Sequence, residues 1–362
     1  MSEIYVSLLL HFYQPPWQRE DVLKRIIDEC YLPLIDYLKR NKSLPLTINL
    51  NYSLIEVLKN HRFNDIAEGF EQVMPYLDVT NTAAYHIIIP LVLALPNGEI
   101  IVRDQIELNK RYLERIGAKP TGFFPPEMAV DEETIRVAES DWVMADAISY
   151  DFVNRGTIPF DYIGIFVRPI FFRSSHWSNE LTLGMPSRRD FNIESYIKRL
   201  LKGINEWFNG NSGYIILAFD GETLGHHVPQ YRNFLEQFFN ELERLKIKIV
   251  PVSRLLEIFP QRKIEVISKA SWSTSLDDIR VGKYYPLWLD TENEIHIRWY
   301  EILRQLAEVY PFLDEEQKKR VQREMNSCIP WHSSHGNNSF FDEWIKGIEK
   351  LNQEIFHNLV KV

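Results

Sequence analysis

The sequence of 362 residues contains only two cysteines, Cys30 and Cys328. So few cysteines, far apart in the chain, exclude a disulfide-rich extracellular scaffold and a metal site built from clustered cysteines. The first residues, MSEIYVSLLLHFYQPP, have no basic segment before their apolar stretch, and that stretch is too short for a signal peptide or a membrane span. We therefore expect a cytoplasmic protein.

Positive charge is also scarce, because 41 lysine and arginine residues stand against 50 aspartate and glutamate residues, which gives a net charge of −9. Nucleic acids and anionic membranes are bound by basic surfaces, so we expect neither as a partner and predict a neutral or small ligand. Aromatic residues, by contrast, make up 13% of the chain. Such rings more often fill a core, but rings that line a cleft also stack on flat apolar ligands.

Short apolar runs alternate with helical patterns over the first two thirds of the chain. Most runs do not alternate with polar residues, which is typical of strands buried on both faces. Between them, apolar side chains recur every fourth residue from Val22 to Leu38 and with helical spacing over 193–204. Strands that alternate with helices predict a parallel sheet, and about seven to eight such units are enough to close a barrel. The apolar runs are residues 5–10, 44–50, 76–82, 122–124, 142–146, 169–173, 213–219 and 247–252.

The pattern changes after Pro251, where a loop-like aromatic stretch is followed by amphipathic helices. The chain also exceeds the size at which single cores stop growing, roughly 250–300 residues. We therefore predict an α/β barrel over 1–265 and, over 266–362, an aromatic loop with a small C-terminal helical domain that contributes to the cleft. The helices are predicted over residues 291–310, 314–325 and 341–358.

Two long irregular segments, around 150–190 and 269–290, are candidates for active-site loops. Loops of this length without regular structure of their own are uncommon in a compact domain and are often functional.

Polar or ionisable residues follow the apolar runs. They are His11, Asn51, His86, Glu127 and Asp220. The carboxyl ends of the strands in a parallel barrel all face the same way, and sites are built on that face. The sequence therefore predicts that these five side chains gather at one mouth of the barrel.

Each of these residues also has an ordinary structural interpretation. Asp220 could cap a helix, because aspartate is among the preferred capping residues. Glu127 lies where an acid would complement the dipole of a helix over 131–139. His11 and His86 could be buried core histidines with satisfied hydrogen bonds, which is the commoner fate of a lone histidine.

Two kinds of chemistry suit the same residues. Glu127 and Asp220 could form the carboxylate pair of a glycoside hydrolase, in which one acts as nucleophile or base and the other as acid. A metal centre would instead recruit Asp220 with His11 and either His86 or His226. His226 has a second histidine beside it, but adjacent side chains on a helix diverge by about 100°, so this pair is a weak metal signal.

Five separate segments resemble the motifs of glycoside hydrolase family 57, whose members are retaining α-glucan-active enzymes with an incomplete (β/α)7 barrel followed by helices. Tyr13 stands where the first motif of the family has a histidine, and Phe123-Phe124-Pro125-Pro126 stands in place of Trp-rich surroundings. The segments are LHFYQP (10–15), VTNTAAYHIIIPL (79–91), GFFPPE (122–127), AFDGETLG (218–225) and IPWH (329–332).

The resemblance implies that Glu127 is the catalytic nucleophile and Asp220 the acid/base. It implies no cofactor and no metal ion. Glu222 would lie on the same side as Asp220 if the strand continued, which suggests that Glu222 tunes Asp220 or contacts sugar. The residues expected to bind or shape the substrate site are His11, Tyr13, Gln14, His86, Glu222, Trp272, Trp331 and His332.

The function that the resemblance implies is a retaining glycoside hydrolase or transglycosidase of the α-amylase or 4-α-glucanotransferase type, which acts on α-linked glucose oligosaccharides or polysaccharides. Two alternatives stay open. One is a metal-dependent polysaccharide deacetylase-like enzyme, and the other is a non-catalytic carbohydrate-binding protein on the same barrel. The motifs leave the choice between hydrolysis and transfer, the linkage, the chain length, the acceptor and the oligomeric state undetermined.

Overall fold

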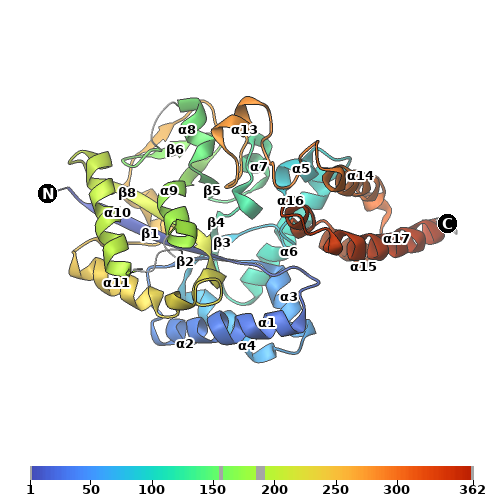
Figure 1. Cartoon of the computed structure of the whole chain (residues 1–362), viewed down its shortest axis with the longest axis horizontal. Helices are drawn as coiled ribbons and strands as arrows, with labels where there is room; N and C mark the ends of the chain where they lie inside the picture. Colours follow the sequence, from blue (N-terminus) through green and yellow to red (C-terminus); the bar gives the residue numbers. More distant parts are fainter. Residues whose placement is uncertain (1, 155–157, 185–191, 360–362) are drawn as a thin grey trace.

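The computed structural model describes residues 2–154, 158–184 and 192–359. Its centre is a single sheet whose strands are β1 (Ile4–Phe12), β2 (Thr47–Leu50), β3 (Asp78–Asn81), β4 (Pro120–Phe123), β5 (Trp142–Asp146), β6 (Ile163–Ile165), β7 (Pro169–Arg173), β8 (Gly213–Asp220), β9 (Lys248–Ile249) and β10 (Gln261–Lys263). Their order is β10-β6-β7-β5-β4-β3-β2-β1-β8, and β9 pairs with β1 (Figure 1).

Within the described ranges, the seven strands β7, β5, β4, β3, β2, β1 and β8 form a continuous parallel series. The two ends of this series, β7 and β8, approach each other, since the Ser174 N–H just after β7 donates a 2.9 Å hydrogen bond to the carbonyl of Ile216 in β8. The sheet therefore curls toward a barrel. The predicted barrel-like core of parallel strands and helices is thus confirmed. Sequence reasoning missed β6, which is antiparallel to β7, and β10, whose exposed residues Gln261–Lys263 carry no apolar signal.

Helices follow most of the strands. They are α1 (Glu20–Ile26), α2 (Leu32–Arg40), α3 (Tyr52–Asn60), α4 (Asn64–Val73), α5 (Ile89–Leu93), α6 (Gly98–Arg115), α7 (Glu132–Val137), α8 (Ile148–Asn154), α9 (Ser175–Asn179), α10 (Ile193–Phe208), α11 (Phe234–Arg244), α12 (Leu255–Ile258) and α13 (Leu276–Arg280). None of the helices in the described part of the chain combines the length and the apolar character that crossing a membrane needs.

The first helical stretch contains a wide turn. A π-helical turn, Ile27–Tyr31, joins α1 to α2 without a break. Apolar residues spaced every four positions would drift around an ordinary helix of 3.6 residues per turn. The wider turn compensates for this drift, so that Ile26, Cys30, Leu34 and Leu38 are all buried.

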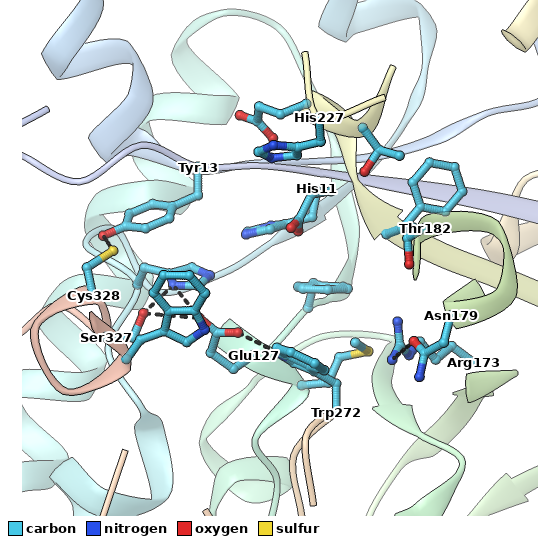
Figure 2. Close-up of a pocket in the computed structure, with 18 of the residues that line it drawn as sticks. His11, Tyr13, Glu127, Arg173, Asn179, Thr182, His227, Trp272, Ser327 and Cys328 are labelled. Carbon is cyan, nitrogen blue, oxygen red and sulfur yellow. Dashed lines mark hydrogen bonds and ion pairs between the residues drawn. The ribbon is translucent and has the colours of Figure 1, made fainter. Parts of the chain in front are cut away.

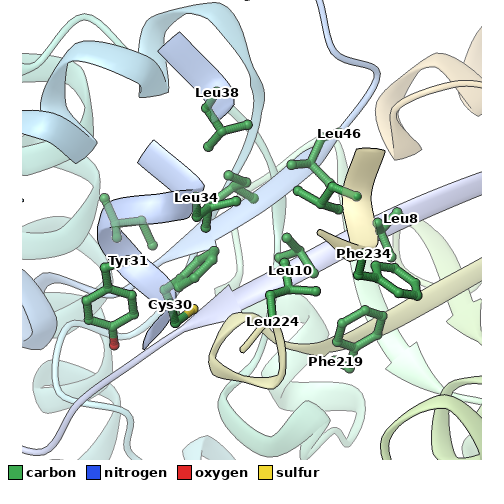
Figure 3. Packing of buried hydrophobic residues seen from close by; sticks show 14 of the residues in the cluster. Leu8, Leu10, Cys30, Tyr31, Leu34, Leu38, Leu46, Phe219, Leu224 and Phe234 are labelled. Carbon is green, nitrogen blue, oxygen red and sulfur yellow. The ribbon is translucent and has the colours of Figure 1, made fainter. Parts of the chain in front are cut away.

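The core lies on both faces of β1. Leu8 and Leu10 point outward and pack in one hydrophobic cluster with residues of α1, α2 and α11 (Figure 3). Leu9, between them, belongs to a second cluster inside the barrel. Because successive side chains of a strand alternate between its faces, His11 follows Leu9 on the inner face, near the carboxyl end of the strand. The strand therefore delivers this histidine to the barrel mouth.

The C-terminal helices pack against one side of the barrel (Figure 1). They are α14 (Glu294–Val309), α15 (Glu315–Glu324), α16 (Cys328–Ser334) and α17 (Ser339–Leu359). Trp299 and Trp344 share a hydrophobic cluster with Ile87 and Phe123 of the barrel. The predicted C-terminal helical region is present, although α16 was missed. The division of the chain at residue 265 stays a prediction.

Gly122 in β4 makes room for a large buried ring. It lies opposite Trp142 in the neighbouring strand β5, and a Cβ atom at Gly122 would lie 2.2 Å from the indole of Trp142. Glu127 follows this strand by four residues, so the glycine helps to set the position of that carboxylate.

We expect Gly122→Ala to lower the free energy of unfolding by about 1–3 kcal/mol, because overpacking a tight core forces the indole or the strand to move. Chemical denaturation would measure the change. Gly347→Ala is the control, since a Cβ atom at Gly347 in α17 meets nothing within 4 Å. That substitution should raise the free energy of unfolding by about 0.5–1 kcal/mol. Equal effects of the two substitutions would contradict the packing argument.

Candidate active site

A cavity of about 380 Å³ opens at the carboxyl ends of the parallel strands. Asn51, which was also predicted at the mouth, instead caps α3, but all but one of the residues expected to react or to bind substrate line the cavity. They are Glu127, Asp220, His11, Tyr13, Gln14, His86, Glu222, Trp272 and Trp331. Figure 2 shows Tyr13, Ser327 and Cys328 on one side of this cavity and Arg173, Asn179 and Thr182 on the opposite side.

Glu127 sits in a strained turn that directs it into the cavity. After β4 the chain enters a 3-10 turn, Pro126–Met128, in which Glu127 has the left-handed backbone angles φ 58° and ψ 15°. Such a conformation costs a non-glycine residue about 1–3 kcal/mol and persists only where the surroundings hold it. The turn holds the carboxylate before any substrate arrives.

Trp272 holds this turn at two points. Its indole N–H donates a 2.6 Å hydrogen bond to Oε2 of Glu127, and its backbone N–H donates a 3.2 Å bond to the Glu127 carbonyl. The hydroxyl of Ser327 donates to the other carboxylate oxygen, Oε1, at 3.2 Å. Both partners come from the C-terminal part of the chain, so the barrel strands alone do not complete the surroundings of Glu127.

Burial, helped by the charge of Asp220, outweighs the hydrogen bonds from Trp272 and Ser327 and raises the pKa of Glu127 to about 7. The neighbouring His86 does not supply a compensating positive charge. Burial holds the pKa of His86 well below its ordinary value, and its Nδ1 lies 3.6 Å from Oε1 of Glu127. The neutral imidazole instead hydrogen-bonds Ser327 at 2.9 Å.

Asp220 is the last residue of β8 and lies opposite His11 in the β1–β8 register. Its side chain makes no capping hydrogen bond to the 3-10 turn that follows, Gly221–Thr223. The capping interpretation of Asp220 is therefore wrong. Asp220 is exposed at the cavity, whereas Glu127 is largely buried.

Glu222 does not continue the strand as expected, because the chain turns at Gly221. A Cβ atom at Gly221 would lie 2.0 Å from the ring of Phe12, so this close approach requires glycine. The turn buries the Glu222 carboxyl, which accepts hydrogen bonds from the Tyr31 hydroxyl and, at 3.0 Å, from Gln14 Nε2. Burial, followed by the charge of Asp220, raises the pKa of Glu222 to about 8.

Four rings stack in a column along one wall of the cavity. The ring centroids are 5.1 Å apart for Phe124 and His11, 4.8 Å for His11 and His86, and 4.1 Å for His86 and Tyr13. His11 is fixed by a 2.7 Å hydrogen bond between its Nδ1 and the side-chain carbonyl of Asn49. Tyr13, which replaces the expected histidine, thus ends the column, and its hydroxyl accepts from Cys328 Sγ at 3.4 Å.

His332 is the predicted site residue that the structure places elsewhere. Its ring stacks on Phe340 at 4.1 Å and lies 6.0 Å from Trp17. Adjacent side chains on a helix point about 100° apart, so α16 cannot direct both Trp331 and His332 into the cavity. The structure therefore does not place His332, which was expected to bind or shape the substrate site, in the lining of this cavity.

The alternative metal site is not assembled either. His226 points to Glu29, with Nδ1 2.6 Å from the carboxylate, and only its neighbour His227 lines the cavity. Across the described ranges, no group of three or more histidine, cysteine, aspartate or glutamate side chains is arranged to hold a metal ion.

Sequence reasoning missed a buried ion pair at the cavity wall. Arg173, the last residue of β7, lies 2.6 Å from Asp146 of β5, and it also donates to the Ala218 carbonyl at 2.9 Å and to Asn179 Oδ1 at 3.1 Å. The signal that could have identified Arg173 is the one used for Asp220, a charged residue at the end of an apolar run.

Both predicted segments contribute to the cavity, although 150–190 is not the irregular loop expected, because it contains β6, β7 and α9. The segment 150–190 supplies Asn179, Thr182 and Leu183, and 269–290 supplies Trp272. Residues 155–157 and 185–191 of the first segment lie outside the described residues. The other lining residues not predicted for the site are Phe124, Met128, Phe219, Thr223, His227, Ser327 and Cys328.

Comparisons with known proteins agree with this architecture. A sequence model described as glycosyl hydrolase family 57 matches residues 4–268. An alpha-amylase of Pyrococcus horikoshii is 21% identical over 293 residues, which cover 75% of this chain and 43% of that protein. The crystal structure of a 4-alpha-glucanotransferase from Thermococcus litoralis has a TM-score of 0.73 and 14% identity, and the match covers 92% of this chain and 56% of that one.

A third protein matches over nearly its whole length. The crystal structure of an alpha-amylase from Thermotoga maritima has a TM-score of 0.73 and 14% identity, and the match covers 99% of this chain and 94% of that one. By contrast, the chain spans about half the length of the Pyrococcus amylase and of the Thermococcus glucanotransferase. At these identities the structural matches support the fold.

The buried Glu127 carboxyl should make the protein less stable as it ionises. Its pKa of about 7 in the folded protein lies above its ordinary value of 4.5, so the folded state binds more protons than the unfolded state between these pH values. Stability is therefore lost as the pH rises through this window. We expect the free energy of unfolding of Glu127→Gln to exceed that of the wild type. The difference should grow from about pH 5 and reach a plateau of roughly 3–4 kcal/mol above pH 8.

Urea denaturation at several pH values would measure this difference. Glu265→Gln, at an exposed position after β10, is the matched control and should give a difference that does not change with pH. A flat difference for Glu127→Gln as well would contradict the raised pKa.

Proposed function

Because the chain belongs to glycosyl hydrolase family 57, we propose that it is a retaining enzyme that acts on α-linked glucose oligosaccharides or polysaccharides through a covalent glycosyl-enzyme. The observation that carries this proposal is the pair of carboxylates at one cavity, with Glu127 fixed by Trp272 and Ser327 and Asp220 exposed at the end of β8. The names of the Pyrococcus alpha-amylase and the Thermococcus 4-alpha-glucanotransferase support an α-glucan as the substrate.

Glu127 is the nucleophile in this proposal. A nucleophilic carboxylate must be ionised and held at the sugar carbon that it attacks. The hydrogen bonds from Trp272 and Ser327 favour the ionised form against the opposing effect of burial. The left-handed turn fixes the backbone of Glu127, so little reorganisation is needed when the substrate binds.

Asp220 is the general acid and base. It protonates the leaving glycosidic oxygen as Glu127 attacks, and it later takes a proton from the water or sugar hydroxyl that releases the product. An exposed carboxyl that caps no helix is free to exchange protons with both. Water as the acceptor gives hydrolysis, whereas a second glucan chain gives transfer.

The remaining predicted residues bind the substrate in this proposal. Neutral imidazoles at His11 and His86 offer hydrogen bonds to sugar hydroxyls, and Trp331 offers a ring face on which a sugar can stack. Glu222, kept protonated near neutral pH by its burial, stands beside Asp220 without a negative charge of its own. We expect the reaction to need neither a cofactor nor a metal ion.

The two alternatives make different predictions in the same assays. A deacetylase would release free acetate from N-acetylated glycans and lose activity with a chelator. A protein that only binds carbohydrate would bind maltooligosaccharides without turnover, and replacing Asp220 would not change this. The hydrogen-bonded His226–Glu29 pair and the fixed Glu127 carboxylate favour the glycosidase over both alternatives.

Replacing the nucleophile tests the mechanism directly. We expect Glu127→Ala to lose at least ~10³-fold in kcat on maltooligosaccharides while it keeps the fold. Azide at high concentration should restore part of the activity, because it fits the space left by the carboxylate. Since azide attacks the α-linked substrate from the opposite face, NMR should identify the product as the β-glycosyl azide. An α-glycosyl azide would contradict retention through Glu127.

The acid role of Asp220 predicts a dependence on the leaving group. Asp220→Ala should lower kcat/KM for maltooligosaccharides by about 10²–10⁴-fold, because their leaving oxygen needs a proton. The loss with α-maltosyl fluoride should be less than about 10-fold, because fluoride leaves without protonation. Glu127→Gln serves as the control. Both substrates need the nucleophile, so this variant should lose activity on both to a similar extent. Equal losses of Asp220→Ala on the two substrates would show that Asp220 is not the acid.

A further inference from the structure

A second cavity of about 570 Å³ lies beside the catalytic one. Residues from the end of β5, from α9 and α10 and from the loop after residue 271 surround it. The two cavities have Trp272 and Asn179 in common. In the view of Figure 2, Trp272 lies between Glu127 and Asn179. The two cavities therefore adjoin at these two side chains.

The lining of the second cavity suits a neutral polyhydroxylated ligand. Three indoles, from Trp177, Trp207 and Trp272, line it, and so do His176 and Ser174, which carry polar atoms. Cavities that bind small molecules combine apolar and aromatic walls with a few placed polar groups in this way. Sugars present apolar C–H faces to such rings and hydroxyl groups to the polar atoms.

The charged group in this lining is already neutralised. Asp146 is buried, and its Oδ2 lies 2.6 Å from Arg173. Its Oδ1 accepts hydrogen bonds from the Ser175 hydroxyl at 2.6 Å and from the Ile148 N–H at 3.1 Å. The carboxylate is thus committed to these partners and is not available to a cation.

Asn179 and Trp272 are oriented for a ligand that crosses from one cavity to the other. The Oδ1 of Asn179 accepts a 3.1 Å hydrogen bond from Arg173, which fixes the amide so that its N–H groups remain as donors. Trp272 is held by its N–H to Glu127 at 2.6 Å, so its ring cannot rotate away when a sugar stacks on it. Both residues are therefore positioned before a ligand binds.

We propose that the second cavity binds further glucose units of the same α-glucan chain whose scissile bond lies between Glu127 and Asp220. This inference rests on the proposed function and names the substrate more narrowly as an oligosaccharide long enough to fill both cavities. It follows that binding energy from units remote from the reacting bond contributes to turnover, so the enzyme discriminates by chain length.

The test compares a long and a short substrate. We expect Trp177→Ala to lower kcat/KM for maltoheptaose by about fivefold to tenfold, which corresponds to the loss of one aromatic stacking contact. The ratio of kcat/KM for maltoheptaose to that for maltotriose should fall by the same factor. Calorimetric titration of maltoheptaose into Trp177→Ala in a Glu127→Gln background should show the matching loss of affinity without turnover.

His176→Ala covers the case in which Trp177→Ala unfolds, because His176 is exposed and its removal leaves no cavity in the core. It should also lower the chain-length ratio. Tyr76→Ala is the matched control, since Tyr76 is an exposed ring that precedes β3 at the opposite end of the strand from the cavities. It should leave the ratio unchanged.

The two hypotheses fail in distinguishable ways. If the wild type turns over neither maltooligosaccharide, the proposed function is wrong. If the wild type cleaves both and the ratio is unchanged in folded Trp177→Ala and His176→Ala, the proposed function stands and the second cavity is not a subsite. An equal loss on the two substrates would also contradict the proposal, because it would indicate a general disturbance of the catalytic cavity.

Discussion

The double hydrogen bond between Trp272 and Glu127 is the contact on which the rest of the candidate site depends. It joins a loop of the C-terminal part of the chain to a strained turn after β4, and it fixes both the backbone and the carboxylate of one residue. Without these bonds, burial would favour the protonated carboxyl and the left-handed turn would lose a support. Ser327 adds a third hydrogen bond from the same part of the chain. The aromatic loop and the helices thus complete an arrangement that the barrel begins.

The carboxyls around the cavity have different environments and therefore suit different tasks. Glu127 is largely buried and held by donors, Asp220 is exposed, and Glu222 is buried against Tyr31 and Gln14. Three negative charges in so small a volume would repel one another strongly. Burial keeps Glu222 protonated near neutral pH, so it adds no negative charge beside the two residues proposed to react.

Much of the barrel could be predicted because its signals are local. Apolar runs gave the strands, and the common direction of parallel strands placed His11, His86, Glu127 and Asp220 at one mouth. The predictions that were wrong concern residues whose orientation depends on where the chain turns. The orientation of Glu222 follows from a turn at Gly221 that the ring of Phe12 requires, and this contact spans more than two hundred positions of sequence. Local sequence patterns do not predict a contact between residues so far apart in the chain.

The π-helical turn at Ile27–Tyr31 ties the length of the first helical stretch to the chemistry at the cavity. The extra residue in this turn sets which side chain faces the barrel, and the one that reaches Glu222 is Tyr31. Losing one residue there would rotate everything that follows by about 100°. The apolar stripe of α2 and the phenol that supports a buried carboxyl would then be out of register together. A substitution in this stretch would therefore disturb the site less than a change in its residue count, because the Tyr31 hydroxyl has to reach the Glu222 carboxyl.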